Sequence, residues 1–294
     1  MFKGALTALA TPMRAGQLDL AALRALVELQ ITEGIDGLVA CGTTGETPAL
    51  EQSEQALVIR TVVEQARRRV PVLAGAGANA TAHAVVLSRM AAECGADGLL
   101  HVTPYYNKPT QAGLLAHFRA ISEATPLPIV LYNVPGRTGC DLLPETIAEL
   151  AQLERVVAVK EASGSIARGQ QVIAACQRVR KEFAVLSGDD ALALALTAVG
   201  GQGVISVVSN VAPKLMAQLI RLASEAKLAE ARAIHYRLLR LMDLMFCESN
   251  PIPVKAAVAL LGFGDNELRL PLQPLAGAKL EQLGAELTRL GLVP

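Results

Sequence analysis

The sequence predicts an α/β fold in which parallel strands close into a (β/α)8 TIM barrel, followed by a C-terminal helical domain. Short aliphatic runs alternate with longer amphipathic stretches up to about residue 210 of the 294-residue chain. Most of the short runs are apolar at both odd and even positions, as expected of strands buried on both faces. Alternating strands and helices imply parallel pairing through crossover helices, and about eight such units close a barrel.

The expected strands are the runs richest in aliphatic and β-branched residues, at positions 6–10, 37–41, 72–75, 98–103, 129–132, 156–160, 184–187 and 203–206. Helical patterns lie between them, for example at residues 19–33, 52–68, 82–94 and 112–123. The change of hydrophobic period from one kind of segment to the other is what distinguishes strand from helix here.

A weak internal repeat supports this organisation. Gly-Ile-Asp-Gly-Leu at 34–38 and Gly-Ala-Asp-Gly-Leu at 95–99 each end a helical pattern and begin a strand. Glycine at a helix C-terminus adopts the left-handed conformation at low cost. A doubly wound sheet is the main competing fold. It usually carries a glycine-rich phosphate turn after its first strand, whereas residues 7–12 read Thr-Ala-Leu-Ala-Thr-Pro.

Strand signals stop after about residue 211. Leucine and alanine at helical spacing predict helices at residues 211–226, 228–246, 253–261 and 275–290. We therefore place the barrel at residues 1–224 and a helical domain at residues 225–294, with no low-complexity linker between them.

The composition excludes several classes of protein. Lysine plus arginine equal aspartate plus glutamate at 27 each, and aromatic residues make up only 3%, which argues against a nucleic-acid surface. No apolar run approaches the length of a membrane span, and the first residues do not resemble a signal peptide. The five cysteines show neither a disulfide framework nor metal-ligand spacing, so we expect a reduced, cytoplasmic protein.

Catalytic residues of such barrels lie where the strands end at the C-terminal face. Lys160 ends the apolar strand at 156–160, which places its amine at the barrel mouth. A lysine held in apolar surroundings can attack a ketone and form an imine. Taken alone, Lys160 fits better a strand-end lysine whose amine reaches solvent while its stem stays in the core.

Four further residues strengthen the case for a site. Tyr132 ends the neighbouring strand, where its phenol can relay protons, although many such tyrosines only line a core. Thr43 and Thr44 lie between two glycines, so backbone N–H groups there can bind a small anion; a helix-capping turn is the alternative. Arg137 in a Gly-Arg-Thr-Gly loop can hold a carboxylate with two hydrogen bonds, unless it is merely solvated.

Other chemistries find little support in the sequence. The four histidines are dispersed and have no carboxylate or cysteine at ligand spacing, so we expect no metal site. No Gly-x-Ser-x-Gly nucleophile motif occurs. Asp189 and Asp190 are adjacent and point in different directions, which suits charge at the start of a helix better than a catalytic pair.

Taken together, the motifs at the strand ends resemble those of the dihydrodipicolinate synthases, a family of class I pyruvate aldolases. The resemblance covers essentially the whole chain, in order. It rests on Gly-Thr-Thr-Gly-Glu at 42–46, Val-Thr-Pro-Tyr-Tyr-Asn at 102–107, Tyr-Asn-Val-Pro-Gly-Arg-Thr-Gly at 132–139, Lys-Glu-Ala at 160–162, Ser-Gly-Asp-Asp at 187–190 and Asn-Pro-Ile-Pro-Val-Lys at 250–255.

This resemblance implies a cofactor-free condensation of pyruvate with L-aspartate 4-semialdehyde in the diaminopimelate and lysine pathway, by a homotetramer. Pyruvate would form an imine, lose a methyl proton to give an enamine and attack the aldehyde, after which the substrate amine would close the ring and displace the enzyme. The implied roles are Lys160 for the imine, Tyr132, Thr44 and Tyr106 (from a neighbouring subunit) for the proton relay, Thr43 and Thr44 for the pyruvate carboxylate, Arg137 for the semialdehyde carboxylate, and Gly188 and Ile205 for the pocket wall.

Two alternatives remain open at this point. A sister aldolase, such as a sialic-acid lyase or a keto-sugar-acid aldolase, would share the lysine and the tyrosine, but the Arg137 loop and the double tyrosine favour the synthase. A non-catalytic relative should have lost Lys160 or Tyr132, and both are present.

The resemblance also implies a regulatory cleft for L-lysine, formed by Thr47, Gln52, Asn79, His83 and Tyr105. Lysine-sensitive members have a glutamate where His83 stands and a histidine where Gln52 stands. A histidine cannot supply the negative charge that a desolvated ammonium group requires. We therefore expect weak or absent feedback inhibition.

Overall fold

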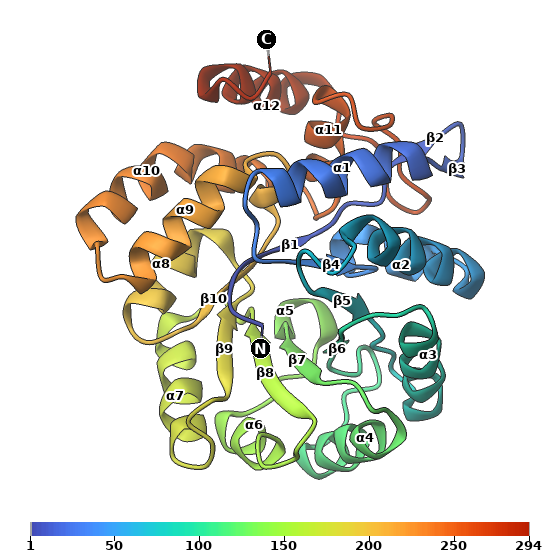
Figure 1. The fold of residues 1–294 in the computed structure, drawn as a ribbon, viewed down its shortest axis with the longest axis vertical. Coiled ribbons are helices and arrows are strands. Elements are labelled where there is room, and N and C mark those ends of the chain that lie inside the picture. Colours follow the sequence, from blue (N-terminus) through green and yellow to red (C-terminus); the bar gives the residue numbers. More distant parts are fainter. Residues whose placement is uncertain (1, 294) are drawn as a thin grey trace.

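The computed structural model describes residues 2–293, and their strands form a closed barrel of parallel strands (Figure 1). The order around the barrel is β1-β10-β9-β8-β7-β6-β5-β4. The strands are β1 (Gly4–Ala8), β4 (Gly37–Ala40), β5 (Val72–Gly75), β6 (Gly98–Val102), β7 (Ile129–Asn133), β8 (Val156–Glu161), β9 (Ala184–Ser187) and β10 (Gly203–Ser206). Each strand pairs in parallel with its neighbours, so all the strand C-termini reach one face of the barrel.

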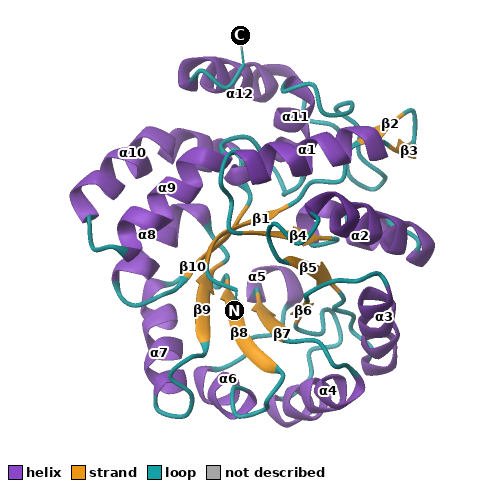
Figure 2. Cartoon of the chain, in the orientation of Figure 1, coloured by secondary structure: helices purple, strands orange, loops and turns teal. Residues whose placement is uncertain are grey.

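Helices surround the barrel on its outer side (Figure 2). They are α1 (Leu20–Thr32), α2 (Gln52–Ala66), α3 (Thr81–Glu93), α4 (Gln111–Ala124), α6 (Pro144–Leu150), α7 (Ile166–Gln177) and α8 (Asp190–Ala198), whereas the short α5 (Pro135–Thr138) directly follows β7 and lies near the centre of the view. The predicted TIM barrel is therefore confirmed, and every expected strand exists with its ends displaced by two residues or fewer. The α/β alternation in the sequence was sufficient for this because each strand is buried on both faces.

A short hairpin after β1 lies outside the expected pattern. The strands β2 (Met13–Arg14) and β3 (Gln17–Leu18) form an antiparallel hairpin between β1 and α1. Ala15 and Gly16 in its turn both have positive φ angles, of 50° and 77°. Two-residue strands are too short to show a period-2 pattern, so sequence periodicity could not reveal them.

The repeat at Gly34 and Gly95 has the predicted geometry, since both glycines have a φ of 85° just after a helix ends. The aspartate two positions later has a matching role in each copy. Asp36 accepts a hydrogen bond from the Ala5 N–H at 2.8 Å, and Asp97 accepts one from the Val72 N–H at 2.8 Å. Each copy therefore joins the start of its strand to the neighbouring strand of the barrel.

The C-terminal part of the chain is helical, as predicted. Its helices are α9 (Pro213–Ser224), α10 (Leu228–Leu244), α11 (Ile252–Leu260) and α12 (Gly277–Leu290). In Figure 1, α12 lies at the upper edge of the view, and it packs against α10 and α11. The proposed boundary between residues 224 and 225 falls between α9 and α10 and stays a prediction.

Two hydrophobic clusters stabilise the fold. The larger one lies between the strands and the surrounding helices, and the smaller one fills the barrel interior with side chains such as Leu6, Val39, Leu73 and Ile205. Tyr132 belongs to the interior cluster, 7% exposed at the end of β7. The barrel is therefore a packed core whose polar chemistry is confined to its mouth.

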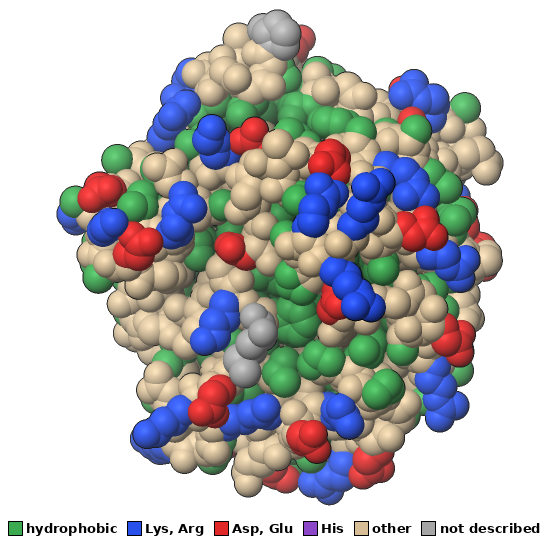
Figure 3. Space-filling view, in the orientation of Figure 1, with side chains coloured by type: hydrophobic (Ala, Val, Ile, Leu, Met, Phe, Trp, Pro, Cys, Tyr) green, Lys and Arg blue, Asp and Glu red, His purple; other side chains and the backbone are tan. Residues whose placement is uncertain are grey.

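The surface agrees with the balanced composition. On the face drawn in Figure 3, lysine and arginine side chains alternate with aspartate and glutamate. No helix within residues 2–293 is long and apolar enough to cross a membrane.

Candidate active site

Lys160 and Tyr132 lie side by side at the barrel mouth. They are register partners on the parallel strands β8 and β7. The Lys160 Nζ lies 4.3 Å from the centre of the Tyr132 ring, and both side chains are buried, 6% and 7% exposed. Residues paired across parallel strands point to the same side, so the pairing of β7 with β8 directs the amine and the phenol into the same space.

The wall around Lys160 requires a glycine at position 188. A Cβ atom at Gly188 would lie 2.5 Å from the Ala162 Cβ and 3.1 Å from the Lys160 Cε. The Gly188 N–H donates to the Glu161 carbonyl at 2.7 Å. Ile205 on β10 is fully buried in the barrel interior. Gly188 thus lies directly against the lysine stem, and Ile205 belongs to the interior cluster; that the backbone of both residues lines the lysine pocket stays a prediction.

The carboxylate next to Lys160 in the sequence is used elsewhere. Glu161 is buried and accepts hydrogen bonds from the Ser163 N–H at 2.7 Å and from the Asn133 side-chain amide at 3.2 Å. Successive residues of a strand point to opposite sides, so Glu161 faces away from the mouth and stabilises the loop after β8.

The Gly-Thr-Thr-Gly-Glu segment forms a short 3-10 helix, η1 (Thr43–Gly45), after β4. Thr44 is 2% exposed, and its hydroxyl accepts a hydrogen bond from the Asn250 Nδ2 at 3.1 Å. Thr43 is half-buried and faces the cavity described below. The turn therefore carries one buried hydroxyl, on Thr44, and one accessible hydroxyl, on Thr43.

A buried ion pair holds the end of this segment. Lys255 on α11 contacts Glu46 at 2.5 Å, with their side chains 2% and 1% exposed. The second oxygen of Glu46 accepts the Arg269 backbone N–H at 2.9 Å. Burial lowers the pKa of the Lys255 amine, and the Glu46 carboxylate opposes that change. Lys255 is thus a second buried lysine, already paired with a carboxylate.

Arg137 lies on α5, directly after β7, and is exposed at the mouth. Its Nη2 donates to the Asn250 carbonyl at 3.1 Å. The following Thr138 is buried and donates its hydroxyl to the Cys140 carbonyl at 2.9 Å, which stabilises the turn that carries the arginine.

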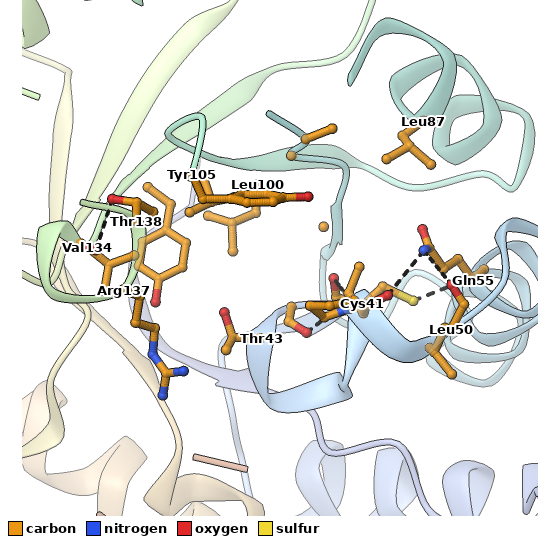
Figure 4. A pocket seen from close by; sticks show the side chains of 18 of the residues that line it. Cys41, Thr43, Leu50, Gln55, Leu87, Leu100, Tyr105, Val134, Arg137 and Thr138 are labelled. Carbon is orange, nitrogen blue, oxygen red and sulfur yellow. Dashed lines mark hydrogen bonds between the residues drawn. The ribbon is translucent and has the colours of Figure 1, made fainter. Parts of the chain in front are cut away.

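These side chains border a cavity of about 400 Å³. Val134, Arg137 and Thr138 lie at one end, and Leu50, Gln55 and Leu87 lie at the other (Figure 4). The expected site residues that line it are Thr43, Thr47, His83, Tyr105, Tyr132 and Arg137. Lys160 borders it through Tyr132, whose ring contacts the amine.

The proposed regulatory residues only partly meet. Thr47, His83 and Tyr105 line the far part of the same cavity, whereas Gln52 is exposed on α2 and Asn79 accepts a hydrogen bond from the Asn107 side chain at 2.8 Å. Within one chain, the expected cleft and the space beside Tyr132 are thus continuous. Weak inhibition by L-lysine stays a prediction.

Tyr106 does not line this cavity. It is 89% exposed and has a φ of 76°, while its N–H donates to the Thr138 carbonyl at 3.1 Å. A non-glycine residue in the left-handed region is uncommon and indicates a constrained loop. The structure of one chain therefore does not bring Tyr106 to Lys160.

The two aspartates after β9 have different surroundings. Asp189 caps α8 by accepting the Ala191 N–H at 2.8 Å, as the sequence predicted. Asp190 is buried and accepts the Val207 N–H at 2.9 Å, and burial raises the pKa of its carboxyl. Within residues 2–293, no group of three or more His, Cys, Asp or Glu side chains could hold a metal ion.

Comparison with known proteins agrees with this geometry. A model of the dihydrodipicolinate synthetase family matches residues 1–290. The chain belongs to this family. A 4-hydroxy-tetrahydrodipicolinate synthase of Nitratidesulfovibrio vulgaris is 51% identical over 293 residues, covering 99% of each chain.

Solved structures of family members have the same fold. The chain is 45% identical to the dihydrodipicolinate synthase of Thermotoga maritima, with a TM-score of 0.98 and full coverage of both chains. The dihydrodipicolinate synthase of Acinetobacter baumannii, solved in complex with pyruvate, is 42% identical with a TM-score of 0.97 and full coverage of both chains. The family resemblance drawn from the motifs is confirmed.

Two features of the site were not predicted as individual residues. Asn250 and Lys255 both belong to the Asn-Pro-Ile-Pro-Val-Lys motif, which carried the resemblance but received no role. They approach Thr44 and Glu46 across more than 200 residues of sequence. The motif itself was the available signal, but only tertiary structure shows which residues it contacts.

Proposed function

We propose that this chain condenses pyruvate with L-aspartate 4-semialdehyde to give 4-hydroxy-tetrahydrodipicolinate, through an imine on Lys160. Its membership in the dihydrodipicolinate synthetase family supports the overall reaction. The observation that supports the mechanism is the buried Lys160 amine 4.3 Å from the Tyr132 ring centre, beside a cavity large enough for two small acids.

The chemistry follows from this placement. The Lys160 amine adds to the pyruvate ketone, water leaves, and the resulting imine accepts electron density from the methyl carbon as a proton departs. The enamine then attacks the aldehyde. The amine of the semialdehyde displaces Lys160 and closes the ring, which returns the enzyme to its starting state. Side chains and substrates supply all the atoms in this sequence.

The proposed roles of the remaining residues agree with their positions. Tyr132 relays protons beside Lys160, and Thr44 continues the relay in the buried turn. Thr43 and the N–H groups of its turn bind the pyruvate carboxylate. Arg137, exposed at the mouth, binds the semialdehyde carboxylate. Gly188 gives the lysine stem its space.

Tyr106 is proposed to complete the relay of a neighbouring subunit in a homotetramer. Its 89% exposure in one chain supports a role outside its own barrel. A cytoplasmic location belongs to the same proposal and rests on the scattered, unpaired cysteines.

Trapping the imine tests this mechanism. Treatment with pyruvate and borohydride should add one reduced pyruvate to Lys160, located by peptide mass, and none to Lys255, the other buried lysine. A coupled assay with pyruvate and aspartate semialdehyde, run beside a sialic-acid cleavage assay, tests the substrate pair. An adduct on another lysine of active enzyme would contradict the assignment of Lys160.

A further inference from the structure

Asn250 of the C-terminal domain contacts the site through two different groups. It is 6% exposed and precedes α11. Its side-chain Nδ2 donates to the Thr44 Oγ1 at 3.1 Å, whereas its backbone carbonyl accepts from the Arg137 Nη2 at 3.1 Å. Asn250 therefore contacts both Thr44, proposed for the proton relay, and Arg137, proposed to bind the semialdehyde carboxylate.

A buried ion pair lies close to the contact between Asn250 and Thr44. Five residues after Asn250, Lys255 forms the buried ion pair with Glu46, two residues after Thr44. Burial makes such a pair costly to separate, so the Thr44 turn and the start of α11 stay in register. The distance between the Asn250 amide and the Thr44 hydroxyl is thus set by the barrel and the helical domain together.

The direction of this hydrogen bond decides what Thr44 can do. A hydroxyl has one O–H to donate and two lone pairs that accept. Because the Asn250 amide fills one lone pair, the Thr44 proton is not used by Asn250 and can be donated into the site. An acceptor at position 250 would instead take that proton and turn the hydroxyl away from the relay.

We propose that Asn250 is a positioning residue for proton transfer, whose side-chain amide orients the Thr44 hydroxyl as a donor toward the Lys160 site. This inference rests on the proposed function. The helical domain would then help to orient a catalytic hydroxyl, since Asn250 lies outside the predicted barrel.

Asn250→Asp is the discriminating variant, because it preserves the shape of the side chain and replaces the donating N–H group with an acceptor. The Arg137 contact uses the backbone carbonyl and remains available in the variant. The matched control is Asn266→Asp. Asn266 lies in the same domain, its Nδ2 donates to the Leu275 carbonyl at 3.0 Å, and its Oδ1, like that of Asn250, is buried without a partner among the described residues.

Proton transfer can be read without the second substrate, as exchange of the pyruvate methyl protons with D₂O followed by NMR. We expect Asn250→Asp to slow exchange roughly 10- to 100-fold, part of the 10²–10⁴ that a positioned acid or base contributes. The Asn266→Asp control should keep the wild-type rate. Asn250→Ala, which also loses the donor, should slow exchange in the same direction and serves if the aspartate variant does not fold.

A second background tests whether Asn250 acts through Thr44. In a Thr44→Val protein, exchange should already be slow, and adding Asn250→Asp should slow it little further, because coupled residues are not additive. The proposal would be overturned if Asn250→Asp exchanged at the wild-type rate, or if Asn250→Asp and Asn266→Asp slowed exchange equally. It would also be overturned if Asn250→Asp slowed exchange in the Thr44→Val protein as much as it does in the wild type. If the wild type forms no borohydride adduct on Lys160, the proposed function fails instead, and this inference fails with it.

Discussion

The two buried lysines, Lys160 and Lys255, differ in what surrounds their amines. Lys255 contacts the carboxylate of Glu46, whereas the Lys160 amine faces the ring of Tyr132. The ion pair ties Lys255 to the turn after β4, whereas the Lys160 amine lies next to Tyr132, a residue that lines the cavity at the barrel mouth. The same residue type thus anchors a turn at position 255 and, in the proposed function, forms the imine at position 160.

Arg137 offers a prediction at the scale of one residue. Arg137→Ala should leave borohydride trapping of pyruvate on Lys160 largely intact, because the guanidinium lies at the mouth, bonded to Asn250. It should raise the KM for the semialdehyde about 10- to 100-fold, since a lost hydrogen bond to a charged group costs about 1.5–3 kcal/mol. Steady-state kinetics with each substrate varied in turn provide the measurement. Lost trapping with an unchanged semialdehyde KM would contradict the assigned role.

At the scale of elements, the segments after β4 and β7 both contact the start of α11. The turn after β4 meets α11 through Glu46, and α5 after β7 meets it through Arg137. Because the strand C-termini share one face of a parallel barrel, a single helical segment can contact several of them. The helical domain therefore helps to position side chains at the mouth of the barrel.

Separating the Glu46–Lys255 pair should destabilise the protein strongly. Lys255→Met leaves the Glu46 carboxylate buried and without its cation, which costs about 3–5 kcal/mol. Lys279→Met is the matched control, because Lys279 forms an exposed pair with Glu248 at 2.9 Å. Exposed pairs contribute about 0–1 kcal/mol, so the control should change little.

Urea unfolding of both variants measures the difference. The double variant Glu46→Gln, Lys255→Met should recover part of the loss, since no unpaired charge remains buried. Equal stability of Lys255→Met and Lys279→Met would show that the buried pair does not hold the turn.

At the scale of the whole molecule, Tyr106 is the residue that one chain leaves unexplained. Mixing inactive Tyr106→Phe and Lys160→Ala subunits should restore activity, because a hybrid site can draw the lysine from one subunit and the tyrosine from the other. Pairing Tyr106→Phe with a Tyr106→Phe, Lys160→Ala subunit is the control and should restore none. Hybrids verified by mass that stay inactive would argue against a shared site.

Two buried histidines, His101 and His117, should make the fold less stable in acid. Burial lowers the pKa of His101 to about 3 and that of His117 to about 4, from an ordinary value of 6.5. At pH values between the lowered pKa and the ordinary value of 6.5, the unfolded chain binds more protons than the folded one. The free energy of unfolding therefore falls as pH falls. Above about pH 7 both histidines are neutral in the folded and the unfolded chain, so they cause no loss of stability. Below about pH 6.5 the free energy of unfolding falls, by on the order of 3 kcal/mol for each histidine near pH 4.

Urea unfolding of wild type, His101→Asn and His117→Asn at pH 7 and pH 4.5 tests this dependence. Each variant should lose less stability than the wild type between the two pH values. His83→Asn is the control, since His83 is exposed. An equal loss in all the proteins would assign the acid sensitivity to other groups.

The barrel, the helical C-terminal part and the family could all be predicted from the sequence. Strands buried on both faces are apolar at every position, and helices with one apolar face have a different period, so local composition carries the alternation. Strand order then follows from parallel pairing, which brings Lys160 and Tyr132 to one face. These two assignments needed only positions along the strands.

Contacts between distant segments were decided by the tertiary structure. Nothing in the spacing of Thr44 and Asn250, or of Glu46 and Lys255, indicates that they meet, because more than 200 residues separate each pair. The exposure of Tyr106 likewise follows from the constrained loop after β6. Sequence period reports which face of an element is buried, whereas hydrogen bonds between elements depend on where the complete fold places each end.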